Sequence, residues 1–200
     1  MTREQLAHVL RTVARISGER DILVIGSQSI LGSYPEDALP VRATGSMEVD
    51  TAFFTDPDGA KADDIDVNLG EFSEFHNEFG YYPQGVSVTT GVFPSGWRDR
   101  LVIFETPSTE PGRGLCLEPH DCILAKLVRF DEKDLDFAVA LVRAGLISLG
   151  ILAERAETLP AHPAVIDRIQ TWIKRHAIPL PAVNRPEAIS GTQGHSTFAS

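Results

Sequence analysis

DILVIGSQSILGSYPEDALPVRATGSMEVDTAFF, residues 21–54, is the stretch that decides the fold of this chain. Its first apolar run, 22–25, has no alternating polar residue and predicts a strand buried in the centre of a sheet. The run breaks at Gly26-Ser27, where a helix is predicted to begin. A helix start behind a buried strand offers free backbone N–H groups, and Ser27 adds a hydroxyl. Together these groups suit a phosphate, although many strand–glycine–helix junctions are purely structural.

A second strand, predicted over 48–54, carries two carboxylates, Glu48 and Asp50. Side chains alternate along a strand with a period of 2, so both carboxylates lie on one face. Adjacent carboxylates repel each other unless a cation lies between them. Beside a phosphate site we expect that cation to be Mg²⁺, which takes oxygen ligands and phosphates together. The alternative is an amphipathic edge strand whose charged face meets water.

Composition and charge narrow the functional classes. The chain has 200 residues and a net charge of −10, which argues against avid non-specific binding to nucleic acid. A local basic patch could still hold a nucleotide or an RNA end. Cys116 and Cys122 are too few for a disulfide framework and fit a reducing compartment. The polar N-terminus and the absence of a long apolar run predict a cytoplasmic protein with no membrane partner.

Periodicity and turn residues divide the rest of the chain into strands, helices and loops. Loops rich in Pro and Gly are predicted at 34–45 and 106–114, and an Asp-Pro-Asp-Gly turn at 56–59. Further strands are predicted at 86–90 and 101–104, and helices at 3–16, 26–33, 60–70, 119–129, 131–144, 148–158 and 162–176. The expected organisation is a mixed-sheet α/β core over 1–115, a helical part over 116–178 and a disordered tail over 179–200. The cleft between the core and the helical part is the expected place for a ligand.

Gly-Ser after a strand, followed by an acidic-x-Asp strand, resembles the nucleotidyltransferase superfamily with the polymerase-β-like fold. The order and spacing of further motifs over 22–152 resemble a bacterial branch of that superfamily near the AbiEii-type toxins of toxin–antitoxin and phage-defence systems. These motifs are Ser46-x-Glu48-Val49-Asp50, Asp64-Ile65-Asp66, Gly70-Glu71, Phe75-His76, Phe79-Gly80-Tyr81-Tyr82, Gly96-Trp97-Arg98-Asp99-Arg100-Leu101, Leu117-Glu118-Pro119-His120-Asp121 and Lys126-Leu127-Val128-Arg129 through Lys133-Asp134.

The resemblance implies an α/β (α+β) fold, with a polymerase-β-like core around a mixed sheet and a helical C-terminal half. It also implies a metal-dependent enzyme that moves a nucleotidyl group from a nucleoside triphosphate to a hydroxyl of an RNA, such as a tRNA 3′ end, or of a protein. The metal would be Mg²⁺, with Mn²⁺ as an alternative, and an antitoxin would be the partner protein.

The same resemblance assigns roles to side chains. Glu48 and Asp50 would hold the metal and act in catalysis, while Gly26 and Ser27 would bind the outer phosphates of the nucleotide. The toxin branch also uses a Lys and an Asp from its helical half, which correspond by position to Lys126 and Asp134. Arg129 lies three residues after Lys126, so both cations share one helix face and suit a triphosphate. A pair of solvated surface cations is the alternative interpretation.

Two departures from the superfamily pattern favour a different function. Glu48 stands where the superfamily usually has Asp, and 86–90 carries no third carboxylate, for which Glu105 is the only substitute we identify. Both departures favour a catalytically silent nucleotidyltransferase-like module that binds or regulates a partner.

Two further groups resemble sites but are expected to be structural. Asp64 and Asp66 follow a turn and fall on a helix, where residues two apart do not share a face. His120 lies between Cys116 and Cys122 at a spacing that matches no common zinc site.

Overall fold

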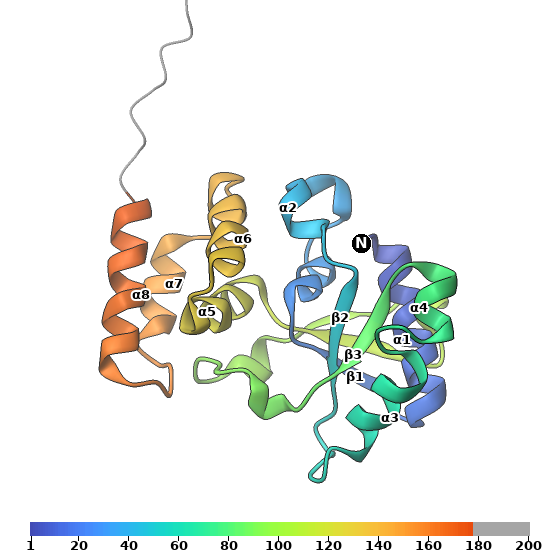
Figure 1. The fold of residues 1–200 in the computed structure, drawn as a ribbon. Helices are drawn as coiled ribbons and strands as arrows, with labels where there is room; N and C mark the ends of the chain where they lie inside the picture. Colours follow the sequence, from blue (N-terminus) through green and yellow to red (C-terminus); the bar gives the residue numbers. More distant parts are fainter. Residues whose placement is uncertain (178–200) are drawn as a thin grey trace, which may run out of the picture.

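The computed structural model describes residues 1–177 of the chain (Figure 1). Its centre is a five-stranded mixed sheet with the order β3-β2-β1-β5-β4. β1 lies in the middle, antiparallel to β2 and parallel to β5, as its unbroken apolar run predicts. The strands are β1 (Asp21–Val24), β2 (Glu48–Ala52), β3 (Tyr82–Gly85), β4 (Val102–Phe104) and β5 (Arg113–Cys116). The predicted α/β class with a mixed sheet is confirmed.

Helix α1 (Arg3–Ser17) packs on one face of this sheet, and α3 (Ala60–Leu69) and α4 (Glu74–Phe79) lie on the same side of the molecule (Figure 1). Thr2 caps α1 and forms a capping box with Gln5, and Gly18 ends the helix in a left-handed conformation with φ 70°. The sequence predicts both ends of α1.

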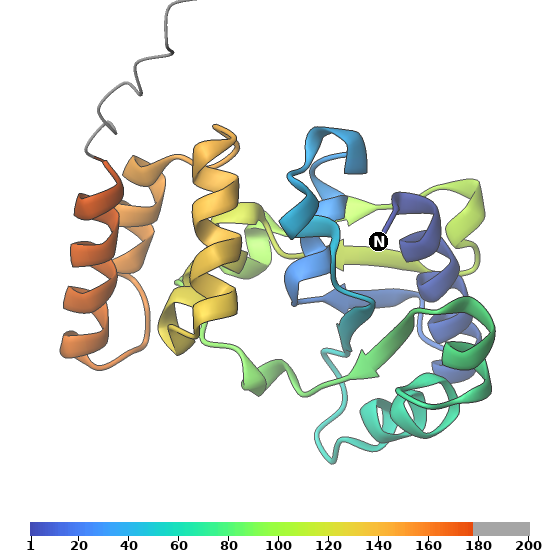
Figure 2. The ribbon, with the colours of Figure 1, turned by 45° about the horizontal axis from the view of Figure 1, so that its top comes forward.

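Residues 119–176 are mainly helical, and the four helices predicted over this range are confirmed. They are α5 (Pro119–Arg129), α6 (Glu132–Arg143), α7 (Leu149–Ala156) and α8 (Pro163–His176). In Figure 2 they lie beside the sheet, and the green segment that follows β3 runs from the sheet toward them. None of the helices among residues 1–177 has the length and apolar character needed to cross a bilayer.

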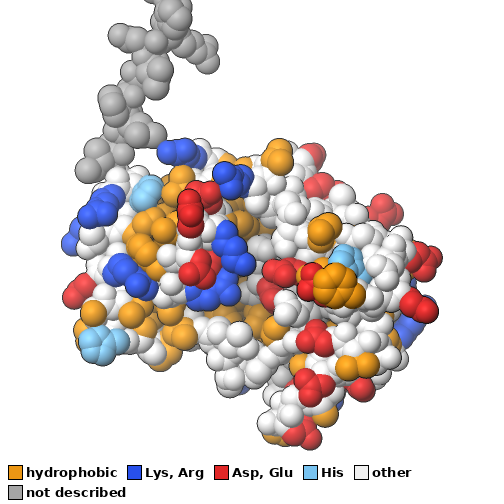
Figure 3. Space-filling view, viewed as in Figure 1, with side chains coloured by type: hydrophobic (Ala, Val, Ile, Leu, Met, Phe, Trp, Pro, Cys, Tyr) orange, Lys and Arg blue, Asp and Glu red, His pale blue; other side chains and the backbone are white. Residues whose placement is uncertain are grey.

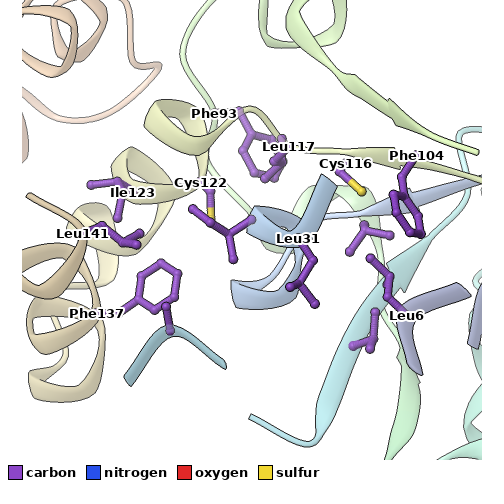
Figure 4. Close-up of a cluster of buried hydrophobic side chains, with 14 of the residues drawn as sticks. Leu6, Leu31, Phe93, Phe104, Cys116, Leu117, Cys122, Ile123, Phe137 and Leu141 are labelled. Carbon is purple, nitrogen blue, oxygen red and sulfur yellow. The ribbon is translucent and has the colours of Figure 1, made fainter. Parts of the chain in front are cut away.

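A continuous hydrophobic core joins the sheet and the C-terminal helices (Figure 4). It runs from Leu6 of α1 through Cys116 of β5 to Ile123 of α5 and Leu141 of α6, all of which are buried. The predicted division of the chain at residues 115–116 therefore falls within β5, inside this core. The division stays a prediction, and the predicted tail at 179–200 lies outside the described residues.

Several predicted elements differ from the structure. The helix after β1 is a 3₁₀ helix, η1 (Ser27–Gly32), and the predicted loop 34–45 contains a 3₁₀ turn, η2 (Glu36–Ala38), and the short helix α2 (Val41–Thr44). The strand predicted at 86–90 is wrong, because the 3₁₀ turn η3 (Val88–Thr90) occupies it. The strand in this region is β3, which ends just before residue 86. It contains Pro83 and Gly85 and lies at the edge of the sheet, where a proline costs no ladder hydrogen bond. β5 begins inside the predicted loop 106–114.

Candidate functional site

The end of β1 brings Gly26 directly against Asp50 of β2. The backbone N–H of Ile25 donates to the Asp50 carbonyl at 3.1 Å, which continues the antiparallel pairing of Val24 with Thr51. A Cβ atom on Gly26 would lie 1.6 Å from Asp50 Oδ2. Any other residue at this position would therefore displace the Asp50 carboxylate.

The negative charge of Asp50 is only partly stabilised by its surroundings. Burial raises the pKa of the Asp50 carboxyl above its ordinary value, and the charge of Glu48 raises it further. Lys126, Arg129 and Lys133 act in the opposite direction and favour the carboxylate. A half-buried carboxylate with a raised pKa beside a second carboxylate is typical of a group that binds a cation.

Lys126 and Arg129 reach the same region from α5, and Asp134 of α6 holds both of them. Lys126 Nζ donates to Asp134 Oδ1 at 2.8 Å, and Arg129 donates to both Asp134 oxygens at 2.8–3.1 Å. The Asp134 side chain is 1 % exposed, whereas that of Arg129 is 54 % exposed. Burial opposes the charge of Asp134, but the two cations outweigh it and hold the pKa of this carboxyl below its ordinary value.

A cavity of about 100 Å³ brings these groups together. Its polar lining includes Gly26, Asp50, Lys126 and Arg129, and the rest is mainly apolar. The residues that line it are Ile25, Gly26, Asp50, Val86, Thr90, Gly91, Val92, Phe93, Cys122, Ala125, Lys126, Val128 and Arg129. Pockets for drug-sized ligands measure roughly 300–1,000 Å³, so this cavity can enclose only part of a nucleotide.

Opposite charges face each other across the boundary between sheet and helices. In Figure 3, Lys and Arg side chains gather on the side of the C-terminal helices, and Asp and Glu side chains gather on the strand side. A second hollow next to β2 and β3 carries three carboxylates. It is lined by Glu48, Asp66, Glu71, Phe72, Tyr82 and Gln84.

Three of the predicted site residues do not line the cavity: Glu48, Ser27 and Asp134. Glu48 lines the second hollow, where burial and the charge of Glu48 raise the pKa of the Tyr82 phenol. Ser27 is half-buried in η1 and does not line the cavity, although its neighbour Gly26 does. Four predicted residues, Gly26, Asp50, Lys126 and Arg129, therefore line one cavity. Asp134 binds the two cations, and Glu48 lines the neighbouring hollow.

The carboxylates fit Mg²⁺ in a limited way. Among the described residues, no group of three or more His, Cys, Asp or Glu side chains is arranged to hold a metal ion. Mg²⁺, however, commonly binds through one or two carboxylates and takes its other ligands from water and substrate phosphates. Asp50, with its unfavourable buried charge, and Glu48 on the same strand face suit that mode of binding.

Glu105 is wrong as the third carboxylate. It follows β4, which runs antiparallel to β5, so it lies at the opposite end of the sheet from Gly26. There it accepts a hydrogen bond from Arg20 at 2.6 Å.

The groups expected to be structural have structural contacts. Asp64 and Asp66 lie on α3, and Asp66 accepts a hydrogen bond from the Gly85 N–H at 2.7 Å. His120 Nε2 accepts from the Ser148 N–H at 3.0 Å, so Nδ1 is the protonated nitrogen and donates to Glu118 at 2.6 Å.

Sequence reasoning missed two features around the cavity. The first is the apolar wall at residues 86–93, which the wrong strand prediction concealed. The second is the buried ion-pair network of Arg100, Asp121, Arg155 and Glu118, which ties the turn after this wall to α5 and α7. The part of the cavity wall that α5 forms could have been found from the sequence. Its residues Cys122, Ala125, Lys126 and Arg129 follow helical spacing on one face.

A family model described as "Nucleotidyltransferase of unknown function (DUF6036)" matches residues 4–168. The matched range contains every residue that lines the cavity, together with Glu48 and Asp134. Neither a curated protein nor a solved structure matches the chain.

Proposed function

Because the chain belongs to this DUF6036 family of nucleotidyltransferases, we propose that it moves a nucleotidyl group from a nucleoside triphosphate to a hydroxyl, with Mg²⁺ or Mn²⁺ as cofactor. One observation carries the proposal: a half-buried carboxylate, Asp50, shares a small cavity with two cations, Lys126 and Arg129. Catalysis of phosphoryl and nucleotidyl transfer consists mainly of positioning and charge stabilisation, for which these groups suffice.

Each residue of the site has a role that follows from its contacts. Asp50 would hold the metal together with Glu48, which lines the neighbouring hollow but lies on the same face of β2. The metal would supply positive charge at the α-phosphate and lower the pKa of the attacking hydroxyl. Lys126 and Arg129 neutralise negative charge on the phosphates. Gly26 leaves room for the Asp50 carboxylate, and its half-buried backbone, followed by Ser27, would lie near the outer phosphates.

Asp134 is a positioning residue in this proposal. Its lowered pKa makes it a poor base, because a carboxylate held by two cations has little affinity for a proton. Its hydrogen bonds to Lys126 and Arg129 instead fix where the two cations point.

The acceptor and the biological role are proposed on the resemblance of the motifs. An RNA such as a tRNA, or a protein, would supply the hydroxyl, and the enzyme would act as the toxin of a toxin–antitoxin or phage-defence system. A bound antitoxin would then cover or distort the cavity.

The test compares wild type with Asp50→Asn, using each α-³²P nucleoside triphosphate, Mg²⁺ and total RNA or lysate. We expect the transfer rate of the variant to be at least about 100-fold lower, because removal of one charge-stabilising group commonly lowers a rate by this factor. Without metal the variant should be more stable by about 1 kcal/mol, or ~2–4 °C in Tm, because an unfavourable buried charge is gone.

The matched control is Asp64→Asn, which removes an exposed carboxylate of α3. It should leave both the rate and the Tm unchanged. Mg²⁺ with a triphosphate should raise the Tm of wild type and of Asp64→Asn but not of Asp50→Asn. Transfer that survives in Asp50→Asn would refute the proposed site.

The second candidate is a silent binding module, favoured by Glu48 in place of Asp and by the lack of a third carboxylate around the cavity among residues 1–177. It predicts triphosphate binding that does not depend on Mg²⁺ and no labelled product with any nucleotide.

A further inference from the structure

Two aromatic rings and a guanidinium group form a partly exposed stack beside the sheet, in which Phe54 and Arg98 are exposed and Trp97 is half-buried. The rings of Phe54 and Trp97 are stacked, with centroids 6.1 Å apart and an interplanar angle of 29°. The Arg98 guanidinium carbon lies 5.1 Å from the Phe54 ring centroid and 5.4 Å from that of Trp97. Phe54 is 42 % exposed, and Arg98 is exposed and forms no ion pair with any residue in 1–177. We call these three residues the stacking surface.

The stacking surface lies on the same face of the sheet as the candidate site. Asp50 and Ala52 share a face because they are two residues apart on β2. Ala52 pairs with Leu23, Leu23 with Leu115, and Leu115 with Ile103, so the same face continues across β1, β5 and β4.

An aromatic path connects the stacking surface to the cavity. Phe93 lines the cavity, and its ring centroid lies 4.7 Å from that of Trp97. The turn that carries Trp97 is held in place, because Arg100 donates to Asp121 at 2.8 Å and to the Ser95 carbonyl at 3.0 Å. Phe93 therefore joins the wall of the cavity to a stack that is fixed in place.

A groove of about 400 Å³ opens beside the stack, lined by Phe54, Arg98, Leu101, Ile103 and Leu115. Its volume is in the range of small-molecule sites, roughly 300–1,000 Å³, and its lining is apolar apart from the guanidinium. Aromatic and guanidinium faces are the groups on which proteins stack unpaired bases.

We propose that the stacking surface binds an unpaired nucleobase of a single-stranded nucleic acid, which supplies the acceptor hydroxyl to the cavity. This inference rests on the proposed function and chooses between the two acceptor classes. The chain carries a net charge of −10, so its field repels phosphates and stacking must provide the affinity. Binding should therefore depend little on salt, unlike the steep loss shown by proteins that bind through phosphate contacts.

The experiment uses Trp97 as its own reporter. The chain has two tryptophans, and the other is Trp172, which is 6 % exposed in α8. In the full-length Trp172→Phe variant, all tryptophan fluorescence comes from Trp97. We expect a short single-stranded oligoribonucleotide to quench this fluorescence, while a duplex of the same sequence does not. The dissociation constant should change less than about threefold between 50 and 200 mM salt.

Two variants test the stack in the same background. Phe54→Ala and Arg98→Ala should each weaken oligonucleotide binding about tenfold, as expected for one base–aromatic contact. The matched control is Arg15→Ala, which removes an exposed arginine from α1 on the other face of the sheet and should change nothing. Absence of quenching, equal weakening by Arg15→Ala or a steep salt dependence would overturn the inference.

Transfer of α-³²P label separates this inference from the proposed function. Label on RNA that is unaffected by Phe54→Ala and Arg98→Ala, or label on protein alone, overturns the stacking surface and leaves the enzyme intact. Quenching of Trp97 with no transfer and no triphosphate binding supports the surface and refutes the proposed function.

Discussion

Asp50 combines two properties of the site: close packing against the backbone of Gly26 and an unfavourable negative charge. Its carboxylate occupies the space that a side chain on Gly26 would need, and burial makes its negative charge unfavourable. Such a residue reduces the stability of the protein, a common cost of keeping a charged group in a functional cavity.

Gly26→Ala tests the contact between these two residues. The added Cβ would overlap Asp50 Oδ2, so the carboxylate must move. We expect a loss of about 1–3 kcal/mol of stability from overpacking and loss of the Tm increase that Mg²⁺ with a triphosphate gives wild type. Thermal denaturation with and without these ligands measures both effects.

The control for this variant is Gly45→Ala. A Cβ at Gly45 would meet its nearest neighbour, the Val41 carbonyl oxygen, at 3.7 Å, an ordinary contact. Gly45→Ala should therefore keep the stability and the ligand response of wild type. If Gly26→Ala behaves in the same way, the contact with Asp50 has no role in the site.

Strand periodicity places Glu48 and Asp50 on one face, and helix periodicity does the same for Lys126 and Arg129. That the two pairs belong to one site is implied only by the resemblance of the motifs. Sequence alone does not predict that Glu48 faces a different hollow. The hollow that Glu48 lines is formed with β3, where Tyr82 pairs with Glu48. Sequence patterns do not predict β3, because Pro83 and Gly85 are uncommon inside strands.

At the scale of elements, the N-terminus of α5 is where the sheet half and the helical half are joined by charge. Glu118 caps α5 by accepting from the His120 N–H at 3.0 Å, and it also binds Arg155 of α7. Asp121, 0 % exposed, pairs with Arg100 at 2.8 Å and with Arg155 at 2.9 Å. Burial opposes the Glu118 charge, but His120 and Arg155 outweigh it and lower the pKa of Glu118 to about 2.

The lowered pKa of Glu118 predicts how stability depends on pH. A carboxylate whose pKa is lower in the folded state stabilises the protein above its unfolded pKa, and that stability is lost as pH falls through the folded value. For Glu118 the loss should extend from about pH 4.5 down to pH 2. Glu118→Gln should therefore be less stable than wild type at pH 7, and the difference should shrink across this window.

Urea unfolding at a series of pH values measures this difference. The control is Glu154→Gln, an exposed glutamate on the same helix as Arg155. It should follow wild type at every pH. A Glu118→Gln variant that remains equally destabilised from pH 7 to pH 2 would assign the loss to the cap hydrogen bonds and not to the charge.

The predicted elements succeed or fail according to how local their signals are. Helix α1 and all four C-terminal helices are found. Each has an apolar stripe, and all but α6 have a side-chain N-cap. β5 is missed because its residues Arg113 and Gly114 look like a loop, and only the close packing of Gly114 on Leu10 of α1 explains the glycine. Such tertiary constraints leave no periodic pattern in the sequence.

At the scale of the whole molecule, the hydrophobic core is shared between the sheet and the C-terminal helices. Leu117, Ile123 and Phe137 of the helical part belong to the same cluster as Leu6 and Phe104 of the sheet part. A shared core couples the unfolding of both parts into one cooperative transition. The predicted domains 1–115 and 116–178 would, as independent units, unfold separately.

The two tryptophans allow a direct measurement of this coupling. Trp97 lies in the sheet part and Trp172 in α8. In Trp97→Phe the fluorescence reports on Trp172, and in Trp172→Phe it reports on Trp97. For each variant we expect the urea midpoint from fluorescence to coincide with the midpoint of the same variant from circular dichroism. A fluorescence midpoint below the circular dichroism midpoint in one variant and above it in the other would instead support two domains.

The bonds from Lys126 and Arg129 to Asp134 also have a consequence for affinity. Ordering a long side chain when a ligand binds costs about 0.5–1.5 kcal/mol. Asp134 fixes both side chains when the protein folds, so a nucleotide meets cations that have already lost their rotamer freedom. For two such residues the saving is about 1–3 kcal/mol, and the buried carboxylate thereby contributes to binding a ligand that it need not touch.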